Sequence, residues 1–134
     1  PLARAFLTGT LIDPEAELEA KDIRRQMPRF EPANYAKNLG LLADYRQIAA
    51  EAGCTPAQLA LAWLLHQGNS ILPIPGTRSV ENLREWLAAA DVQLSYEVLA
   101  SVGELINTNT VSGHRYAEQA RGEVDTEDFA APAR

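Results

Sequence analysis

One segment of this sequence has the pattern of a buried β-strand, and helical patterns flank it on both sides. Ser70–Pro75 (SILPIP) is short and apolar, and Gly68 and Gly76 bound it. A lone strand leaves its backbone N–H and C=O groups without partners, so the rest of the sheet must lie outside these residues or in another chain. Pro73 has no N–H to donate, so pairing there must be irregular or one-sided. We expect the strand to span 71–75.

Helical spacing of apolar residues predicts four helices, over 35–52, 55–67, 79–90 and 95–106. Thr55 is placed as the N-cap of the second helix, with Pro56 at its first position and Gln58 completing a capping box. Ser79 and Ser95 are placed as N-caps of the third and fourth. The second helix is apolar nearly all round and therefore needs cover on more than one side.

Helices before and after a single strand indicate parallel pairing through crossovers, which is typical of an α/β barrel or a doubly wound sheet. Residues 1–33 read as a long functional loop with a short helix near 18–25, and 107–134 as a closing loop and an acidic tail that is mobile from Ala117. Because the chain starts at Pro1 in a loop-like stretch, we expect a piece cut from a larger protein, with apolar faces that the missing part or self-association must cover.

Composition limits the partners of this 134-residue chain. Its net charge of -6 disfavours nucleic acid over most of the surface, so any phosphate site must be local. Gln47–Thr55 resembles the start of a helix-turn-helix DNA reader, but residues 55–67 contain no lysine or arginine to contact DNA. Cys54 is the single cysteine, and neither a leader nor a long uncharged span is evident, so a cytoplasmic, membrane-free setting is expected.

The strongest local signal for chemistry is Gly76-Thr77-Arg78-Ser79, between the strand and the third helix. A glycine lets the backbone approach a ligand closely, and the free N–H groups of a helix start together with a guanidinium favour a phosphate. The same four residues also suit an ordinary strand-to-helix turn with an exposed arginine, and spacing alone leaves both interpretations open.

Four segments, in order, resemble the C-terminal part of bacterial aldo-keto reductases: 1–9 (PLARAFLTG), 55–63 (TPAQLALAW), 74–77 (IPGT) followed by 81–83 (ENL), and 113–116 (GHRY). The resemblance covers most of the chain up to about Tyr116. It implies an α/β fold, namely the C-terminal segment of a TIM (β/α)8 barrel running from the loop after strand 7, with 71–75 as the eighth strand. It also implies reduction of an aldehyde or ketone with NADP(H).

By this resemblance the backbone around the first loop residues wraps the cofactor's pyrophosphate, and the start of the third helix holds the adenosine 2′-phosphate, the ribose and the adenine. The implied cofactor-binding residues are Leu2, Arg4, Gly76, Thr77, Arg78, Asn82 and Glu85. Trp86 stands where the family usually carries an asparagine, which favours a packing role for the indole over adenine recognition.

No catalytic residue is assigned within this chain, because nothing in it matches the family's motifs for the catalytic Asp, Tyr, Lys and His. We expect the chain to be inactive alone. His66, His114 and Cys54 read as structural residues, without neighbours at metal-ligand or nucleophile spacing. The aromatic residues that line a pocket or pack in the core are Phe6, Phe30, Tyr35 and Tyr116. The alternative function is a non-catalytic nucleotide-binding or protein-interaction remnant.

Overall fold

The computed structural model describes residues 1–124, and these residues form helices and turns without a β-strand. The long helices are α2 (Pro32–Glu51), α3 (Pro56–Leu65), α4 (Val80–Leu87) and α5 (Tyr96–Leu105). The short ones are η1 (Ala3–Thr8), α1 (Pro14–Glu17), η2 (Ile23–Gln26), η3 (Pro28–Phe30), η4 (Ala88–Asp91) and α6 (Glu118–Arg121). Residues 117–124 of the predicted mobile tail thus contain α6, and the rest of that prediction lies outside the described residues.

The three predicted N-caps are confirmed. The Thr55 hydroxyl accepts from the Gln58 N–H at 3.1 Å while the Gln58 side chain accepts from the Thr55 N–H at 3.0 Å, which completes the capping box of α3. Ser79 accepts from the Asn82 N–H at 3.2 Å and Ser95 from Val98. The long loop is less irregular than predicted, because α1, η2 and η3 fold within it, and η2 overlaps only the end of the stretch proposed for a short helix.

The predicted strand over 71–75 is wrong for this chain. The segment is extended, but within residues 1–124 no backbone hydrogen bond joins 72–77 to any other segment. The physical reason is that a ladder needs a neighbour, and this part of the chain contains no other extended segment to pair with. Its side chains are left in solvent, with Leu72 84% and Ile74 86% exposed.

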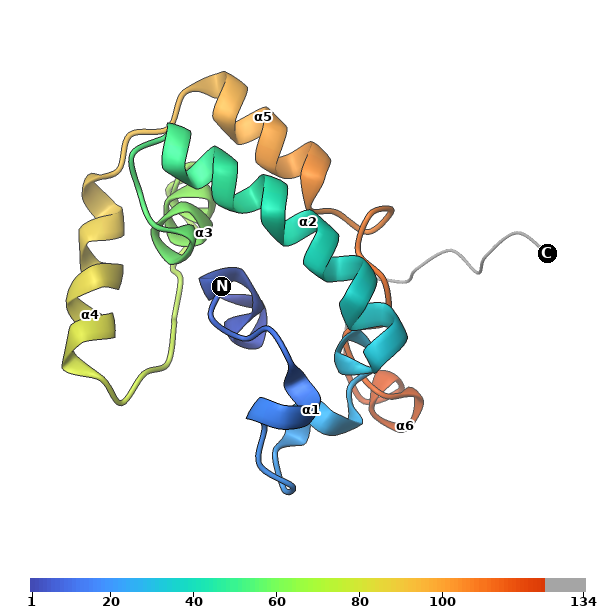
Figure 1. Cartoon of the computed structure of the whole chain (residues 1–134). Coiled ribbons are helices and arrows are strands. Elements are labelled where there is room, and N and C mark those ends of the chain that lie inside the picture. Colours follow the sequence, from blue (N-terminus) through green and yellow to red (C-terminus); the bar gives the residue numbers. More distant parts are fainter. Residues whose placement is uncertain (125–134) are drawn as a thin grey trace.

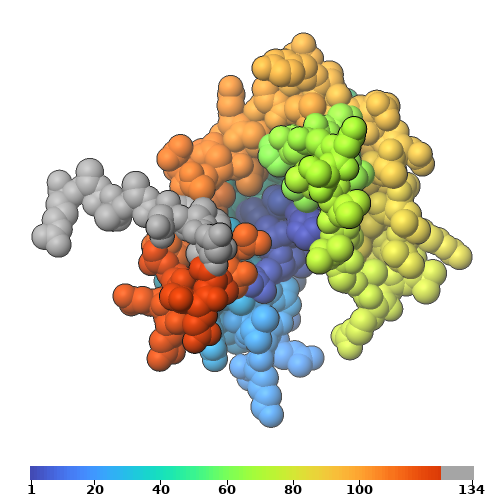
Figure 2. Space-filling model, turned by 180° about the vertical axis from the view of Figure 1, so that it is seen from behind, coloured from blue at the N-terminus to red at the C-terminus, as the bar shows by residue number. Residues whose placement is uncertain are grey.

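The helices form an arc around the N-terminal segment. In Figure 1, α4, α3, α5 and α2 follow one another around η1, and the chain start lies at the centre. From behind, the blue N-terminal residues lie at the floor of a hollow between the green residues after α3 and the orange and red C-terminal segments (Figure 2).

The main core lies where α2, α3 and α5 meet. Leu42, Tyr45 and Leu59 are almost completely buried there, and the Tyr45 hydroxyl donates to the Pro56 carbonyl at 3.0 Å. The Trp63 indole N–H donates to the Leu99 carbonyl at 3.0 Å and so ties α3 to α5. Five of the ten residues of α3 are buried, as its all-round apolar sequence predicts.

None of the helices among residues 1–124 is by itself both long and apolar enough to cross a membrane. The pair α2 and α3 passes a test of length and composition together, but the two helices are bent by 77° at their junction.

Candidate functional site

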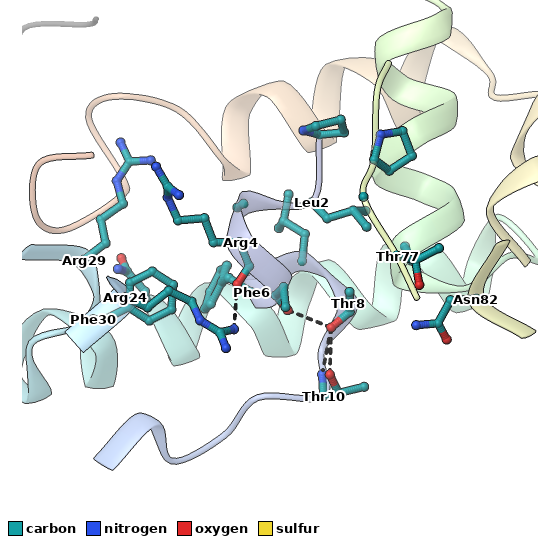
Figure 3. Close-up of a pocket in the computed structure, with 18 of the residues that line it drawn as sticks. Leu2, Arg4, Phe6, Thr8, Thr10, Arg24, Arg29, Phe30, Thr77 and Asn82 are labelled. Atoms are coloured by element: carbon teal, nitrogen blue, oxygen red, sulfur yellow. Dashed lines mark hydrogen bonds between the residues drawn. The ribbon is translucent and has the colours of Figure 1, made fainter. Parts of the chain in front are cut away.

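A cavity of about 860 Å³ lies at the centre of the arc, within the size range of small-molecule and cofactor sites. Figure 3 shows how its wall is built: Leu2, Arg4, Phe6 and Thr8 come from the N-terminal segment. Thr77 and Asn82 lie on one side of that segment, and Arg24, Arg29 and Phe30 lie on the other. Three parts of the chain that are far apart in sequence therefore enclose one space.

The backbone at the cavity wall is strained. Ala3, Arg4 and Ala5 have φ values of 46°, 57° and 75°, so three consecutive residues with side chains adopt the left-handed region. Each left-handed non-glycine residue costs roughly 1–2 kcal/mol. Such strain persists where surrounding contacts over-determine the geometry, and it concentrates at ligand sites. The sequence offers no signal for this turn, because Ala-Arg-Ala is an ordinary helical tripeptide and contains no glycine.

Positive charge gathers on the cavity wall of this acidic chain. Four arginines line it, against two carboxylates. The arginines are Arg4, Arg24, Arg29 and Arg115, and the carboxylates are Asp22 and Glu85. A concave wall carrying one predominant sign of charge raises the local concentration of counter-ions, so this cavity suits an anionic ligand despite the net charge of -6.

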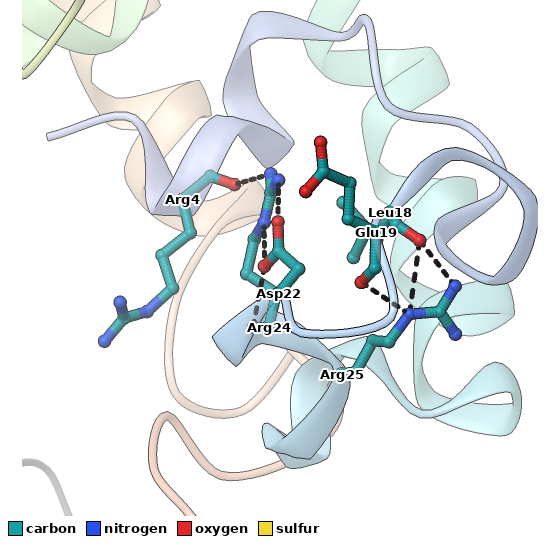
Figure 4. A network of polar contacts seen from close by, with 6 residues as sticks. All are labelled: Arg4, Leu18, Glu19, Asp22, Arg24 and Arg25. Atoms are coloured by element: carbon teal, nitrogen blue, oxygen red, sulfur yellow. Dashed lines mark hydrogen bonds and ion pairs between the residues drawn. The ribbon is translucent and has the colours of Figure 1, made fainter.

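One of the two acidic groups is paired. Asp22 accepts from the Nε and Nη2 atoms of Arg24 at 2.9 and 2.7 Å, and from the Arg24 backbone N–H at 2.9 Å (Figure 4). The hydrogen bonds from Arg24 lower the pKa of the Asp22 carboxyl to about 2. The remaining Nη1 of Arg24 donates to the Arg4 carbonyl oxygen at 3.2 Å. The long loop is therefore joined to the strained turn through one guanidinium.

The segment after α5 also lines the cavity, through Ile106, Val111 and Arg115. The Arg29 Nε donates to the Gly113 carbonyl at 3.1 Å, which holds this segment against η3. The guanidinium carbons of Arg4 and Arg115 lie 5.4 and 5.8 Å from the centroid of the Tyr116 ring. Both distances are within the range of a cation–π interaction, so Tyr116 draws two positively charged side chains together beside the cavity.

Six of the seven predicted cofactor-binding residues line this one cavity: Leu2, Arg4, Gly76, Thr77, Asn82 and Glu85. The exception is Arg78, whose side chain is exposed and is not among the lining residues. Sequence reasoning missed Asp22, Arg24, Arg29 and Arg115. The available signal was the clustering of Arg24, Arg25 and Arg29 in the long loop, and it does not extend to Arg115.

Glu85 and Trp86 have structural contacts as well as a place on the wall. The Glu85 carboxylate accepts from the Thr55 hydroxyl at 2.6 Å, and its carbonyl accepts from Gln58, so it ties α4 to the start of α3. Trp86 is half-buried and packs against the main core, as the packing interpretation expected, and it also borders the cavity. Of the aromatic residues proposed for a pocket, Phe6, Phe30 and Tyr35 line it while packing together.

The tyrosine on the wall is poorly placed to transfer a proton. The Tyr35 hydroxyl donates to the Leu11 carbonyl at 2.8 Å, and burial, with a smaller contribution from Glu17, raises its pKa to about 12. Its proton is therefore held by a backbone oxygen, and its pKa is far from neutral.

The other reactive side chains have structural surroundings. His66 contacts the Ala62 carbonyl through Nδ1 at 2.8 Å, and the Leu94 N–H points to its Nε2 at 3.5 Å. Burial raises the pKa of the Cys54 thiol, which opposes formation of a nucleophilic thiolate. Residues 1–124 contain no group of three His, Cys, Asp or Glu side chains that could hold a metal ion.

Comparison with known proteins gives one consistent result. The Aldo/keto reductase family matches residues 1–107. Aldo-keto reductase yakc [NADP(+)] of Schizosaccharomyces pombe is 41% identical over 124 residues, which is 92% of this chain. Aldo-keto reductase str7 of Strobilurus tenacellus is 34% identical over 129 residues, 96% of the chain. Both relatives are fungal, whereas the resemblance in sequence was to bacterial members. The chain spans 36% and 38% of the two relatives' own lengths.

Proposed function

This chain belongs to the aldo/keto reductase family, and we propose that it supplies the NADP(H)-binding part of the C-terminal portion of a (β/α)8 barrel. The observation that carries the proposal is the single arginine-lined cavity of about 860 Å³ that brings together Leu2, Arg4, Thr77 and Asn82. These family-typical residues come from the N-terminal segment and from the middle of the chain, and they line the same cavity. Its charge fits a ligand with several phosphates.

The donor set of the cavity fits the cofactor. The left-handed turn at Ala3–Ala5 places backbone at the wall beside Arg4, which suits a pyrophosphate. At the opposite side, Gly76, Thr77 and Asn82 would hold the 2′-phosphate and the adenosine. NADPH supplies a hydride when bound, and these residues would bind and orient it. We keep Arg78 in the proposal, because the exposed side chain of an arginine at a helix start is free to turn toward a phosphate.

We further propose that the proton donor for carbonyl reduction comes from the part of the barrel that this chain does not contain. Within residues 1–124, the titratable side chains on the cavity wall are four arginines, two carboxylates and Tyr35. The Tyr35 hydroxyl is turned to the Leu11 carbonyl and its pKa is raised to about 12. The wall can therefore hold an anionic cofactor but lacks a poised acid for a developing alkoxide.

The exposed segment 71–75 supports the barrel part of the proposal. Leu72 and Ile74 are 84% and 86% exposed, and Leu83 and Leu87 of the neighbouring helix α4 are also in solvent. An extended apolar segment without ladder partners is suited to lie between two further strands. The partners we expect are therefore the remaining barrel strands, or a second copy where those are lacking, together with a small carbonyl substrate in the whole enzyme.

A ligand-dependent thermal melt combined with a reductase assay tests this function. NADPH at 100 times its Kd should stabilise the chain by about 2.7 kcal/mol and raise Tm. NADH should raise Tm less, because it lacks the 2′-phosphate. With an aldehyde and NADPH, the chain alone should show no loss of absorbance at the NADPH band. Unchanged Tm at millimolar NADPH would refute cofactor binding, and turnover by the chain alone would refute our placement of the proton donor.

A further inference from the structure

Two neighbouring arginines of the long loop have different tasks in the structure. Arg25 donates only within the loop, to the carbonyl oxygens of Glu15, Leu18 and Glu19. Arg24 instead reaches 20 residues back and donates to the carbonyl of Arg4, inside the left-handed turn (Figure 4). Arg25 therefore folds the loop upon itself, whereas Arg24 connects the loop to the cavity wall.

Asp22 determines the direction of the Arg24 guanidinium. The carboxylate receives Nε and Nη2 on its two oxygens, so the planar guanidinium is held along one edge and Nη1 is left to point at the Arg4 carbonyl. Both side chains are mostly shielded, at 24% and 21% exposure, which limits screening of the pair by salt. Asp22 and Arg24 therefore form one hydrogen-bonded pair, and the pair contacts the turn through the hydrogen bond from Arg24 to the Arg4 carbonyl.

That contact lies at the most strained backbone of the chain's described part. Arg4 has φ 57° and ψ 44°, and its neighbours also have positive φ. A left-handed run of this length is held by contacts outside itself. The Arg4 carbonyl is bound by Arg24 from one side, and the Arg4 guanidinium lies over Tyr116 on the other. The hydrogen bond from Arg24 is the contact through which the long loop holds this turn.

From these contacts we propose that Asp22 and Arg24 are a positioning pair that holds the Ala3–Ala5 turn in its anion-binding shape. The inference rests on the proposed function, since it assigns to the pair the backbone geometry at the pyrophosphate end of the cofactor. Asp22 acts through Arg24, and Arg24 through the Arg4 carbonyl. Neither residue needs to touch the ligand for its loss to weaken binding.

Substitution of Asp22 separates positioning from simple charge. Asp22→Asn removes a negative charge from an anion site, so charge alone predicts tighter NADPH binding. Positioning predicts the opposite, because the amide cannot accept the guanidinium on both oxygens and the turn relaxes. Loss of one such charge-assisted contact should weaken NADPH roughly tenfold. Arg24→Ala should weaken it at least as much.

The experiment measures two things on the parent chain and on Asp22→Asn, Arg24→Ala and the matched control Arg25→Ala. The first is the Kd of NADPH and of adenosine 2′-monophosphate, which lacks the pyrophosphate. The second is amide hydrogen exchange of residues 3–8 without nucleotide. We expect weaker NADPH binding and faster exchange in the first two variants, with adenosine 2′-monophosphate unaffected. Arg25→Ala should resemble the parent in both measurements.

The outcomes distinguish the inference from the proposed function. Tighter NADPH binding by Asp22→Asn, or equal losses for NADPH and adenosine 2′-monophosphate, would overturn the positioning role. A parent chain that binds neither ligand would refute the proposed function instead. In that case the exchange of residues 3–8 still decides the inference: unchanged rates in Asp22→Asn overturn it, and accelerated rates support it.

Discussion

The side chain of Asn38 exchanges two hydrogen bonds with the backbone of Ser112, 74 residues later in the sequence. Its Nδ2 donates to the Ser112 carbonyl at 3.0 Å, and its Oδ1 accepts from the Ser112 N–H at 2.8 Å. Asn38 is the buried polar residue of α2, with 4% exposure. The Asn38 amide thus pairs with both backbone groups of Ser112 and holds the segment around Ser112 against α2.

Asn38→Ala should lower the free energy of unfolding by about 1–3 kcal/mol, because it leaves the Ser112 N–H and C=O unpaired at a part-buried position. Urea-induced unfolding measures the loss. The control is Asn109→Ala, whose side chain is exposed and should change stability by less than about 0.5 kcal/mol. Equal effects of the two substitutions would contradict the role of the Asn38 amide.

Gly113→Ala should displace the C-terminal segment. Gly113 has φ 87°, and a Cβ built there would lie 2.9 Å from the Arg29 nitrogen and from the Pro28 carbonyl carbon, both backbone atoms. We expect a loss of roughly 1–3 kcal/mol in unfolding free energy. Gly103→Ala is the matched control, since its Cβ meets only Trp63 at 3.9 Å within helix α5. That substitution should stabilise the chain by up to about 1 kcal/mol.

Ala5→Gly should stabilise the chain, because glycine adopts the φ of 75° without a steric penalty. The relief of about 1–2 kcal/mol is partly offset by the greater freedom of glycine in the unfolded chain, so we expect a net gain of roughly 0.5–1 kcal/mol. Ala36→Gly, in the exposed interior of α2, should cost about 1 kcal/mol instead. A destabilising Ala5→Gly would show that the turn is not strained in solution.

The Asp22 carboxyl should make stability depend on acid pH. Its folded pKa, about 2, lies below the ordinary value of 3.8, so the deprotonated form is favoured by folding. The contribution is fully present above pH 3.8 and is lost as the pH falls toward 2. The stability gap between the parent and Asp22→Asn should therefore narrow over this interval. Denaturant unfolding at pH 5, 3 and 2 checks this, and a constant gap would contradict the prediction.

Arg78→Ala should weaken NADPH much more than NADH, because only NADPH carries the 2′-phosphate that a guanidinium pairs with. The measurement is the Kd of both cofactors by fluorescence titration. Arg84→Ala is a matched control, since Arg84 is exposed on α4, the helix that follows Arg78, and does not line the cavity. Equal losses for both cofactors would remove Arg78 from the 2′-phosphate site.

Much of the site could be predicted because its residues lie in short local motifs. Gly76 and Thr77 belong to the glycine-containing turn before α4, whereas Leu2, Arg4 and Asn82 come from the resemblance, and all five line the cavity. The roles of residues such as Asp22 could not be predicted in this way. The proposed role of Asp22 depends on the hydrogen bond from Arg24 to the Arg4 carbonyl, 20 residues away. Spacing along the chain does not show which arginine of the loop makes that bond.

The sequence by itself determined where the four long helices lie and where three of them start. The caps at Thr55, Ser79 and Ser95 depend on a side chain meeting an N–H three residues later, so the local order of residues is sufficient. Only the tertiary structure decided that Ala3–Ala5 turns left-handed, since its own residues oppose that shape and distant groups hold it. The same holds for 71–75, which has the composition of a strand but becomes one only where a neighbouring strand supplies the other half of each hydrogen bond.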